Sequence, residues 1–216
     1  MISNGSISIR KMTHCQNDFS LLFKWFNDKE VLSYIEGPAS CYTYEEIVSK
    51  YGPRAKGKHY VTPCIVNYND SPIGYLQFYL LQEDEIQKYG ARLELPPYGL
   101  DIVIGETRYW NMGIGTGALK LILRHLFEQG IKEIFIDPQT WNIRAIRSYE
   151  KCGFRKTKIL YQHERFNGEY KDNQLIKLII LIISTNYGID RKISSIKQKI
   201  ISGVLIILKL DDGGRV

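Results

Sequence analysis

Residues 108–117 read RYWNMGIGTG, and the apolar run ALKLIL follows them directly. The segment 100–104, LDIVI, precedes them and has the apolar character of a strand. This order predicts a strand, a glycine-rich loop and a helix, which together present backbone N–H groups at a helix N-terminus. Because those groups and the helix dipole attract anions, the stretch predicts a phosphate- or pyrophosphate-binding loop.

Two common nucleotide-binding loops fit this stretch poorly. A dinucleotide-binding Rossmann domain places GxGxxG after its first strand, with an acidic residue about 20 residues further on. Here the loop follows the fourth expected strand, and its spacing is GIGTGA. A Walker A loop requires Gly-Lys-Ser/Thr, which this segment lacks. The remaining candidate is the loop of acyl-CoA-dependent N-acetyltransferases, Gln/Arg-x-x-Gly-x-Gly/Ala before a long helix.

Length and composition favour an ordinary globular protein. The 216 residues fit one domain with an appendage, and the net charge is +6. The basic residues are dispersed and match no nucleic-acid motif, so we expect no nucleic-acid partner. The four cysteines have no metal-ligand spacing, so we expect reduced thiols and no metal. The polar start, MISNGSISIRKMT, is unlike a signal peptide and favours the cytoplasm.

Periodicity and capping residues predict the order of elements. We expect helices at 19–26, 116–128 and 142–151, the first capped by Asn17-Asp18. A capping box of Thr43 and Glu46 opens a further short helix that ends before Gly52-Pro53. We expect an acidic loop at 82–98 and strands at 7–10, 60–67, 73–81, 100–105, 133–136, 154–165 and 175–183. Hairpins mixed with a βαβ crossover predict one α/β domain with a mixed sheet and helices on both faces.

The last part of the chain differs in composition. Residues 184–199 are polar and basic, and residues 200–208 are mainly apolar. That run is shorter than the about 20 residues that span a bilayer, so we expect no membrane partner. We take 1–183 as the domain and 184–216 as an appendage, an extra helix or strand packed against it.

A second segment narrows the class of enzyme. Residues 137–154, DPQTWNIRAIRSYEKCGF, resemble the Asn-x-x-Ala-x-x-x-Tyr-x-x-x-Gly-Phe segment of the GCN5-related N-acetyltransferase (GNAT) superfamily. With the glycine loop in the superfamily's order, the resemblance implies an α/β GNAT fold. That fold has a mixed, mostly antiparallel sheet of about seven strands, flanked by helices on both faces.

Further sequence motifs narrow the resemblance to one family. YGLD at 98–101, YW at 109–110, GIGT at 113–116 and NDSPIGY at 69–75 look like the aminoglycoside 6′-N-acetyltransferases, which are cytoplasmic resistance enzymes. The likeness covers roughly residues 5–180. The chain departs at Trp110, where the superfamily has Gln or Arg, and this departure concerns one phosphate contact.

The resemblance implies two catalytic residues. Asp101 would act as the base toward the substrate ammonium, and Tyr149 would donate a proton to the CoA thiolate. An ordinary Asp pKa of about 3.9 is low for a base, but neighbouring carboxylates raise such a pKa. A tyrosine with a pKa of about 10 stays protonated at neutral pH. The alternatives are a strand-end aspartate and a core aromatic.

The resemblance implies acetyl-CoA as co-substrate and assigns its contacts. The backbone of Ile102, Val103 and Ile104 would pair with the pantetheine amides as an added strand does. Asn142 would bond the pantetheine arm, cap its own helix, or both. The pyrophosphate loop comprises Tyr109, Trp110, Met112, Gly113, Ile114, Gly115, Thr116 and Gly117.

The acceptor is implied to be an aminoglycoside such as kanamycin, tobramycin or amikacin. Asp137 matches a family position that faces it, and Asp172 and Tyr75 are further candidates. Carboxylates of the acidic loop would attract a polycation; they are Glu83, Asp84, Glu85 and Glu94. No cysteine stands where an acyl carrier is expected, which favours direct transfer in a ternary complex. We expect a monomer or homodimer. The alternatives are a GNAT that acetylates a protein N-terminus and a non-catalytic acyl-CoA-binding module.

Overall fold

A mixed sheet forms the centre of the computed structural model, which describes residues 1–92, 96–185, 198–201 and 204–210. The strand order is β1-β2-β3-β4-β5-β6-β8-β10-β9, with β7 paired to β8. The strands are β1 (Ile2–Asn4), β2 (Ile7–Lys11), β3 (Val61–Tyr68), β4 (Ser71–Leu80), β5 (Pro97–Ile104), β6 (Glu133–Ile136), β7 (Arg155–Phe166), β8 (Glu169–Thr185), β9 (Gln198–Ile201) and β10 (Val204–Leu210). Only β5/β6 and β8/β10 are parallel pairs among these strands. The expected mixed, mostly antiparallel sheet is confirmed. Strand β1 is additional to the expected strands, and β9 and β10 lie in the appendage, for which an extra helix or strand was expected.

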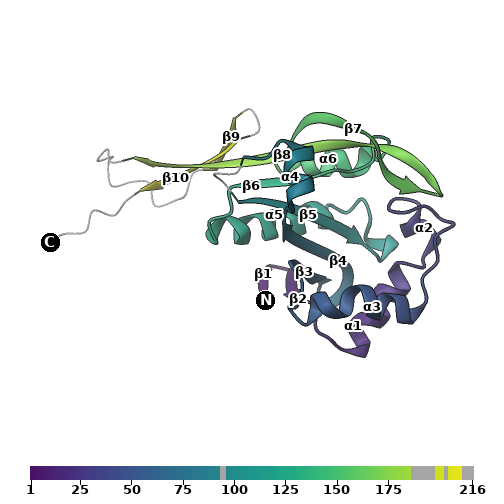
Figure 1. The fold of residues 1–216 in the computed structure, drawn as a ribbon. Coiled ribbons are helices and arrows are strands. Elements are labelled where there is room, and N and C mark those ends of the chain that lie inside the picture. Colours follow the sequence, from purple (N-terminus) through teal and green to yellow (C-terminus); the bar gives the residue numbers. More distant parts are fainter. Residues whose placement is uncertain (93–95, 186–197, 202–203, 211–216) are drawn as a thin grey trace.

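Helices cover both faces of this sheet (Figure 1). They are α1 (Gln16–Trp25), α2 (Lys29–Leu32), α3 (Tyr44–Ala55), α4 (Glu83–Tyr89), α5 (Ile114–Glu128) and α6 (Ile143–Lys151), with a 3-10 turn at Thr107–Tyr109. Side chains alternate along β3, so Cys64 and Val66 pack with α5 while Ile65 packs with α1 and α3. On β5 the same alternation places Asp101 and Val103 on the α1/α3 face.

The parallel strands β5 and β6 diverge along their length. They pair only from Pro97 to Gly99, opposite Glu133 to Phe135. On its other side β5 pairs with β4 from Tyr98 to Ile104. The backbone of β5 from Asp101 onward therefore faces a gap in the sheet on the β6 side. An extended ligand can pair with such a strand edge.

Two predicted helix boundaries are wrong by three residues or more, the start of α1 and the end of α3. Helix α1 begins at Gln16 with Cys15 as its N-cap, so Asn17-Asp18 do not cap it. Asp18 is instead buried and bonded to Arg10 on β2. Helix α3 opens with the expected capping box but continues through Pro53 to Ala55. Its apolar side, with Ile47 and Tyr51 buried, holds the last turn in place despite the proline.

The acidic segment after β4 was expected to be a loop, but it forms helix α4. Glu83, Asp84 and Glu85 occupy its first turn, where carboxylates favour the positive end of the helix dipole. The Glu85 carboxylate accepts a hydrogen bond of 2.9 Å from the backbone N–H of Gln82. Gly90 ends the helix in the left-handed conformation, at φ 68°. The acidity of this segment thus has a local structural cause.

Strand β8 runs through the predicted domain boundary at 183. Strand β10 pairs with it in parallel, beginning with Val204 opposite Ile179, and β9 pairs with β10. Figure 1 shows these strands extending away from the body of the sheet. Across the described ranges, no helix is both long and apolar enough to cross a membrane.

Candidate active site

A cavity of about 900 Å³ opens where β5 and β6 diverge. The glycine loop and α6 form one side of it, and α3 and the segment 31–36 form another. Four carboxylates of the described residues line it: Glu36 after α2, Asp101 of β5, Asp137 at the end of β6 and Glu164 of β7. A cavity that joins a phosphate-binding loop to carboxylates suits a reaction between a phosphorylated carrier and a cationic acceptor.

Asp101 lies in the cavity wall opposite Gln77 of β4. Burial raises the pKa of its carboxyl to about 7, and the charges of Asp137 and Glu164 act in the same direction. The Gln77 side chain opposes this by donating a hydrogen bond of 2.7 Å to Asp101 Oδ2. A carboxylate with a pKa near ambient pH is suited to accept a proton from an ammonium group.

Tyr149 and Asn142 both belong to the α6 region and both line the cavity. Burial, with the nearby charges of Asp101 and Asp137, raises the pKa of Tyr149, so its hydroxyl stays protonated and able to donate. Asn142 Oδ1 accepts a 3.2 Å hydrogen bond from Ala145 N, which makes Asn142 the N-cap of α6. The capping alternative for Asn142 is therefore observed, and its contact with a pantetheine arm stays a prediction.

The glycine loop presents free amides at the start of α5. Gly113 is the N-cap at φ 77°, a conformation that favours glycine. The bond from Gly117 N to Gly113 O, at 2.9 Å, is the first of the helix. The N–H groups of Ile114, Gly115 and Thr116 precede it and stand at the cavity wall. This arrangement is a helix N-terminus that can hold a pyrophosphate.

Two residues predicted for this loop do not line the cavity. Gly117 uses its N–H inside the helix, and a Cβ there would lie 2.6 Å from Ile7 Cδ1, so glycine allows α5 to approach β2. Met112 is 60% exposed on the outer side of the loop. The other predicted loop residues, Tyr109, Trp110, Gly113, Ile114, Gly115 and Thr116, line it.

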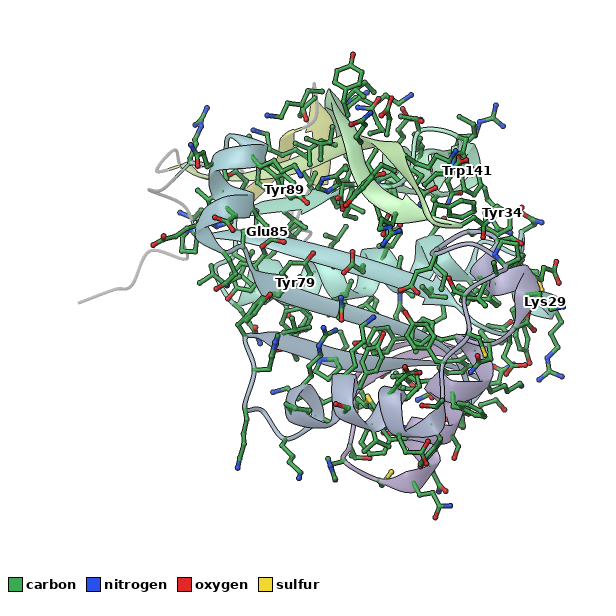
Figure 2. The ribbon with its side chains drawn as sticks, turned by 45° about the vertical axis from the view of Figure 1, so that its right-hand side comes forward. Lys29, Tyr34, Tyr79, Glu85, Tyr89 and Trp141 are labelled. Carbon is green, nitrogen blue, oxygen red and sulfur yellow. The ribbon has the colours of Figure 1, made fainter. Side chains whose placement is uncertain are left out.

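Trp110 ties the glycine loop to the end of β5. Its indole Nε1 donates a hydrogen bond of 2.7 Å to Ile104 O. The guanidinium of Arg144 lies 3.9 Å from the Trp110 ring centroid and 4.0 Å from that of Tyr34, between the two rings. Tyr34 in turn lies beside Trp141 (Figure 2). Trp110 of the glycine loop therefore contacts both α6 and the segment after α2. These contacts could not be predicted from its position in the sequence.

Asp137 is held at the acceptor side of the cavity. Its Oδ2 accepts a hydrogen bond of 3.0 Å from the Tyr89 hydroxyl and lies 2.7 Å from His163 Nε2. Glu164 Oε2 accepts bonds of 3.2 Å from the amides of Gln139 and Asn173. These partners come from α4, β7, β8 and the loop after β6, so distant segments place the two carboxylates together.

Several residues predicted to bind the acceptor lie elsewhere. Glu83 and Asp84 are exposed on α4 and do not line the cavity. Figure 2 shows Glu85 and Tyr89 of this helix far from Tyr34 and Trp141. Asp172 instead accepts a hydrogen bond of 2.9 Å from Gln162 N in the β7–β8 hairpin. Glu94 lies outside the described residues. Tyr75 does line the cavity.

Sequence reasoning also missed cavity residues. Glu164 belongs to a predicted strand, where a carboxylate in an alternating pattern signals only a polar face. Gln77 lies two residues beyond the NDSPIGY segment at 69–75, and its partner Asp101 is 24 positions away. Arg54 lies beyond the point where α3 was expected to end. The missed residues Arg54, Gln77, Arg144 and Glu164 all line the cavity.

Comparison with known proteins agrees with this geometry. Residues 14–161 match the GNAT acetyltransferase domain family. The aminoglycoside N(6′)-acetyltransferase type 1 of Klebsiella pneumoniae is 29% identical over 155 residues, 71% of this chain and 76% of that protein. The structure of aminoglycoside acetyltransferase AAC(6′)-Ib with coenzyme A and kanamycin superposes with TM-score 0.63 at 25% identity, covering 81% of this chain and 95% of that one.

A spermidine N-acetyltransferase from Vibrio cholerae, at TM-score 0.65 and 18% identity over 82% of this chain and 96% of that one, shares the fold. The chain belongs to the GNAT acetyltransferases, enzymes that use acetyl-CoA. It is related at moderate identity to the aminoglycoside 6′-N-acetyltransferases.

Proposed function

We propose that this chain transfers the acetyl group of acetyl-CoA to the 6′-amine of aminoglycosides such as kanamycin, tobramycin and amikacin, and that it confers resistance. The observation that carries the proposal is the cluster of Asp101, Asp137 and Glu164 in the cavity beside the glycine loop. Carboxylates so placed favour an acceptor with several ammonium groups. The similarity to aminoglycoside acetyltransferases supports the same acceptor. We place the reaction in the cytoplasm.

The proposed reaction is a direct transfer in a ternary complex. Asp101 takes a proton from the acceptor ammonium, and the neutral amine attacks the thioester carbon. A C–N bond forms, the C–S bond breaks, and the CoA thiolate takes a proton from the Tyr149 hydroxyl. The second amine proton leaves with solvent as the amide forms. The backbone of Ile102, Val103 and Ile104, at the edge of β5 that faces the gap, would hold the pantetheine arm and offer N–H groups to the oxyanion, while Ile104 O is already bonded to Trp110.

Gly115 tests the proposed pyrophosphate cradle. A Cβ at Gly115 would meet only Ile104 Cγ1, at 3.5 Å, so Gly115→Val is expected to fold and to fill part of the cavity wall. We expect the KM for acetyl-CoA to rise at least about tenfold, because a loss of about 1.4 kcal/mol suffices for that change. Initial rates against acetyl-CoA concentration measure it.

Gly117→Ala is the matched control for Gly115→Val. Its added methyl group would lie 2.6 Å from Ile7 Cδ1, which is too close, so Ile7 would have to shift. The methyl group does not enter the cavity. We expect Gly117→Ala to lower the melting temperature without raising the KM for acetyl-CoA in the folded fraction. An unchanged KM in Gly115→Val would contradict the placement of the pyrophosphate.

Asp137→Asn tests the acceptor side. The amide keeps the size of the side chain but removes a negative charge from the cavity. Hydrogen bonds to charged groups contribute about 1.5–3 kcal/mol, so we expect the KM for kanamycin to rise about 10- to 100-fold. The KM for acetyl-CoA is expected to change less than about twofold, since Asp137 is not in the glycine loop. Equal changes in both constants would argue against a direct contact with the acceptor.

Thiol release tests the function itself. The purified protein is mixed with acetyl-CoA and kanamycin, tobramycin or amikacin, and free CoA is followed over time. We expect release that depends on the aminoglycoside, and acetylation at the 6′-amine by mass spectrometry and NMR of the product. A peptide with a free N-terminus tests the protein-acetylating alternative. Silence with all three antibiotics, or release with the peptide alone, would reject the proposed function.

A further inference from the structure

Gln77 is the centre of a chain of hydrogen bonds that reaches Asp101 from outside the glycine loop and α6. Its Oε1 accepts two bonds of 2.8 Å, one from Arg54 Nη1 and one from the Tyr75 hydroxyl. Its Nε2 donates the 2.7 Å bond to Asp101 Oδ2. Gln77 and Asp101 stand opposite each other on neighbouring strands, so the backbone register already brings them together.

The two donors determine which end of the Gln77 amide faces Asp101. A glutamine side chain carries one acceptor oxygen and one NH₂ group, and the reversed amide would direct its NH₂ at Arg54 and Tyr75. Arg54 has no acceptor at all, so the reversed amide would set donor against donor there. The reversed amide would also set Oε1 against the Asp101 carboxylate. With both donors present, the amide has one favourable orientation.

Arg54 is itself held in place. It belongs to the last turn of α3, and its guanidinium lies 5.1 Å from the centroid of the Tyr51 ring. Its Nε is enclosed and has no hydrogen-bond partner among the described residues. The side chain therefore extends from a fixed helix end to Gln77. Other cations also line the cavity, namely Lys50, Arg144, Arg147 and Lys151. Among these described cations, Arg54 is the one that donates a hydrogen bond to Gln77 and so is linked through it to Asp101.

We propose that Arg54, together with Tyr75, orients Gln77 so that Asp101 always receives an N–H donor, and that Arg54 is thereby a positioning residue of the transfer reaction. The inference rests on the proposed role of Asp101. The donated bond holds one carboxylate oxygen and leaves the other for the acceptor. It also favours the ionised form of Asp101 against burial and the neighbouring acids.

Other titratable groups surround Asp101 and bear on any pH dependence. They are Tyr51 of α3, Tyr75 and Tyr79 of β4, Glu85 and Tyr89 of α4, Asp137 after β6, Tyr149 of α6 and Glu164 of β7. Burial raises the pKa of each of these tyrosines, so they are neutral at physiological pH. The acids oppose ionisation of Asp101, while the hydrogen bond from Gln77 favours it.

Gln77→Glu distinguishes an effect of the orientation of the Gln77 amide from an effect of the packing of its side chain. A glutamate has the same shape and keeps an acceptor for Arg54 and Tyr75, so the packing of this strand pair is retained. It also sets an oxygen against Asp101 in place of a donor. We expect the acid limb of the pH profile of kcat/KM to move up by at least about one unit, with about tenfold less activity below the limb.

Arg54→Met and Arg54→Lys test the cation. We expect Arg54→Met to move the acid limb in the same direction as Gln77→Glu, because the amide loses one of its two orienting donors. Arg54→Lys keeps an N–H donor and is expected to restore most of the wild-type profile. Lys50→Met is the matched control, since Lys50 is a cation of the same helix and cavity wall but is paired with Glu36 at 3.7 Å. It is expected to leave the limb in place.

A carboxyl ¹³C NMR titration of Asp101 in the free protein makes the test independent of turnover, with Asp101→Asn providing the assignment. The inference expects a higher Asp101 pKa in Gln77→Glu and Arg54→Met than in wild type and Lys50→Met. An unchanged Asp101 pKa in both variants would overturn it even if the enzyme acetylates kanamycin. If the pKa moves while every aminoglycoside is left unmodified, Arg54 positions Asp101 and the proposed function fails instead.

Discussion

Asp101→Asn is expected to lower kcat with kanamycin by about 10²- to 10⁴-fold, the usual contribution of a general base. Asparagine keeps the shape of the side chain and can still accept the hydrogen bond from Gln77, but it cannot take the ammonium proton. The KM for acetyl-CoA is expected to stay within about twofold, because the amides of the glycine loop are unchanged. Steady-state rates at pH 7.5 with saturating substrates measure the loss. A kcat within about threefold of wild type would exclude Asp101 as the base.

The same substitution has an expected effect on stability that depends on pH. Since the pKa of Asp101 is raised to about 7 in the folded protein, the folded state binds more protons than the unfolded one between about pH 4 and 7. Its stability therefore falls as the pH rises through that window. Asp101→Asn removes this penalty, of up to about 4 kcal/mol, so the variant should melt higher than wild type at pH 8 and not at pH 4. A lower melting temperature at pH 8 would contradict the raised pKa.

Local signals in the sequence were sufficient for much of the fold and for the glycine loop. Gly113, the capping box of Thr43 and Glu46, and the cap at Asn142 each depend on residues within four positions, and the structure contains all three. The βαβ crossover follows from the order of elements around these caps. Patterns of this range determine where helices begin and which loop lies at a helix N-terminus.

The charge of the site was harder to predict, because acidic residues also serve local structure. The cluster at 83–85 was expected to face the acceptor, but it occupies the first turn of α4. The cavity contains Asp137, as the resemblance implied, together with Glu164, which was not expected there. Asp137 depends on Tyr89 for its position, and Glu164 depends on Gln139 and Asn173. No spacing in the sequence relates these segments. Which carboxylates share a cavity is determined by the tertiary packing.

The pKa of Asp18 is lowered, whereas that of Asp101 is raised. Substitution of Asp18 is expected to have the second large effect, which is on the stability of the fold. Asp18 is 2% exposed, and its carboxylate accepts bonds of 2.7 and 2.6 Å from Arg10 and of 2.7 and 2.9 Å from Thr13 N and Oγ1. Burial alone would raise its pKa, but these donors outweigh burial and lower it. We expect Asp18→Ala to reduce the free energy of unfolding by about 3 kcal/mol, since it leaves the donors of β2 and Thr13 without their acceptor.

Urea unfolding at two pH values distinguishes the buried Asp18 contacts with Arg10 and Thr13 from an ordinary helix cap. Asp28 is a true N-cap, which accepts bonds from Glu30 N and Val31 N, so Asp28→Ala should cost about 1 kcal/mol. Because the pKa of Asp18 is lowered, its stabilisation is present above the ordinary pKa of an aspartate and is lost as the pH falls through the lowered value. The deficit of Asp18→Ala should therefore be full at pH 7 and shrink in acid, while the gain of Asp101→Asn should grow from about pH 4 to about pH 7 and be full above it. Equal costs for the Asp18 and Asp28 substitutions at pH 7 would show that Asp18 contributes no more than a cap, and that the contact between β2 and α1 is held by its apolar residues.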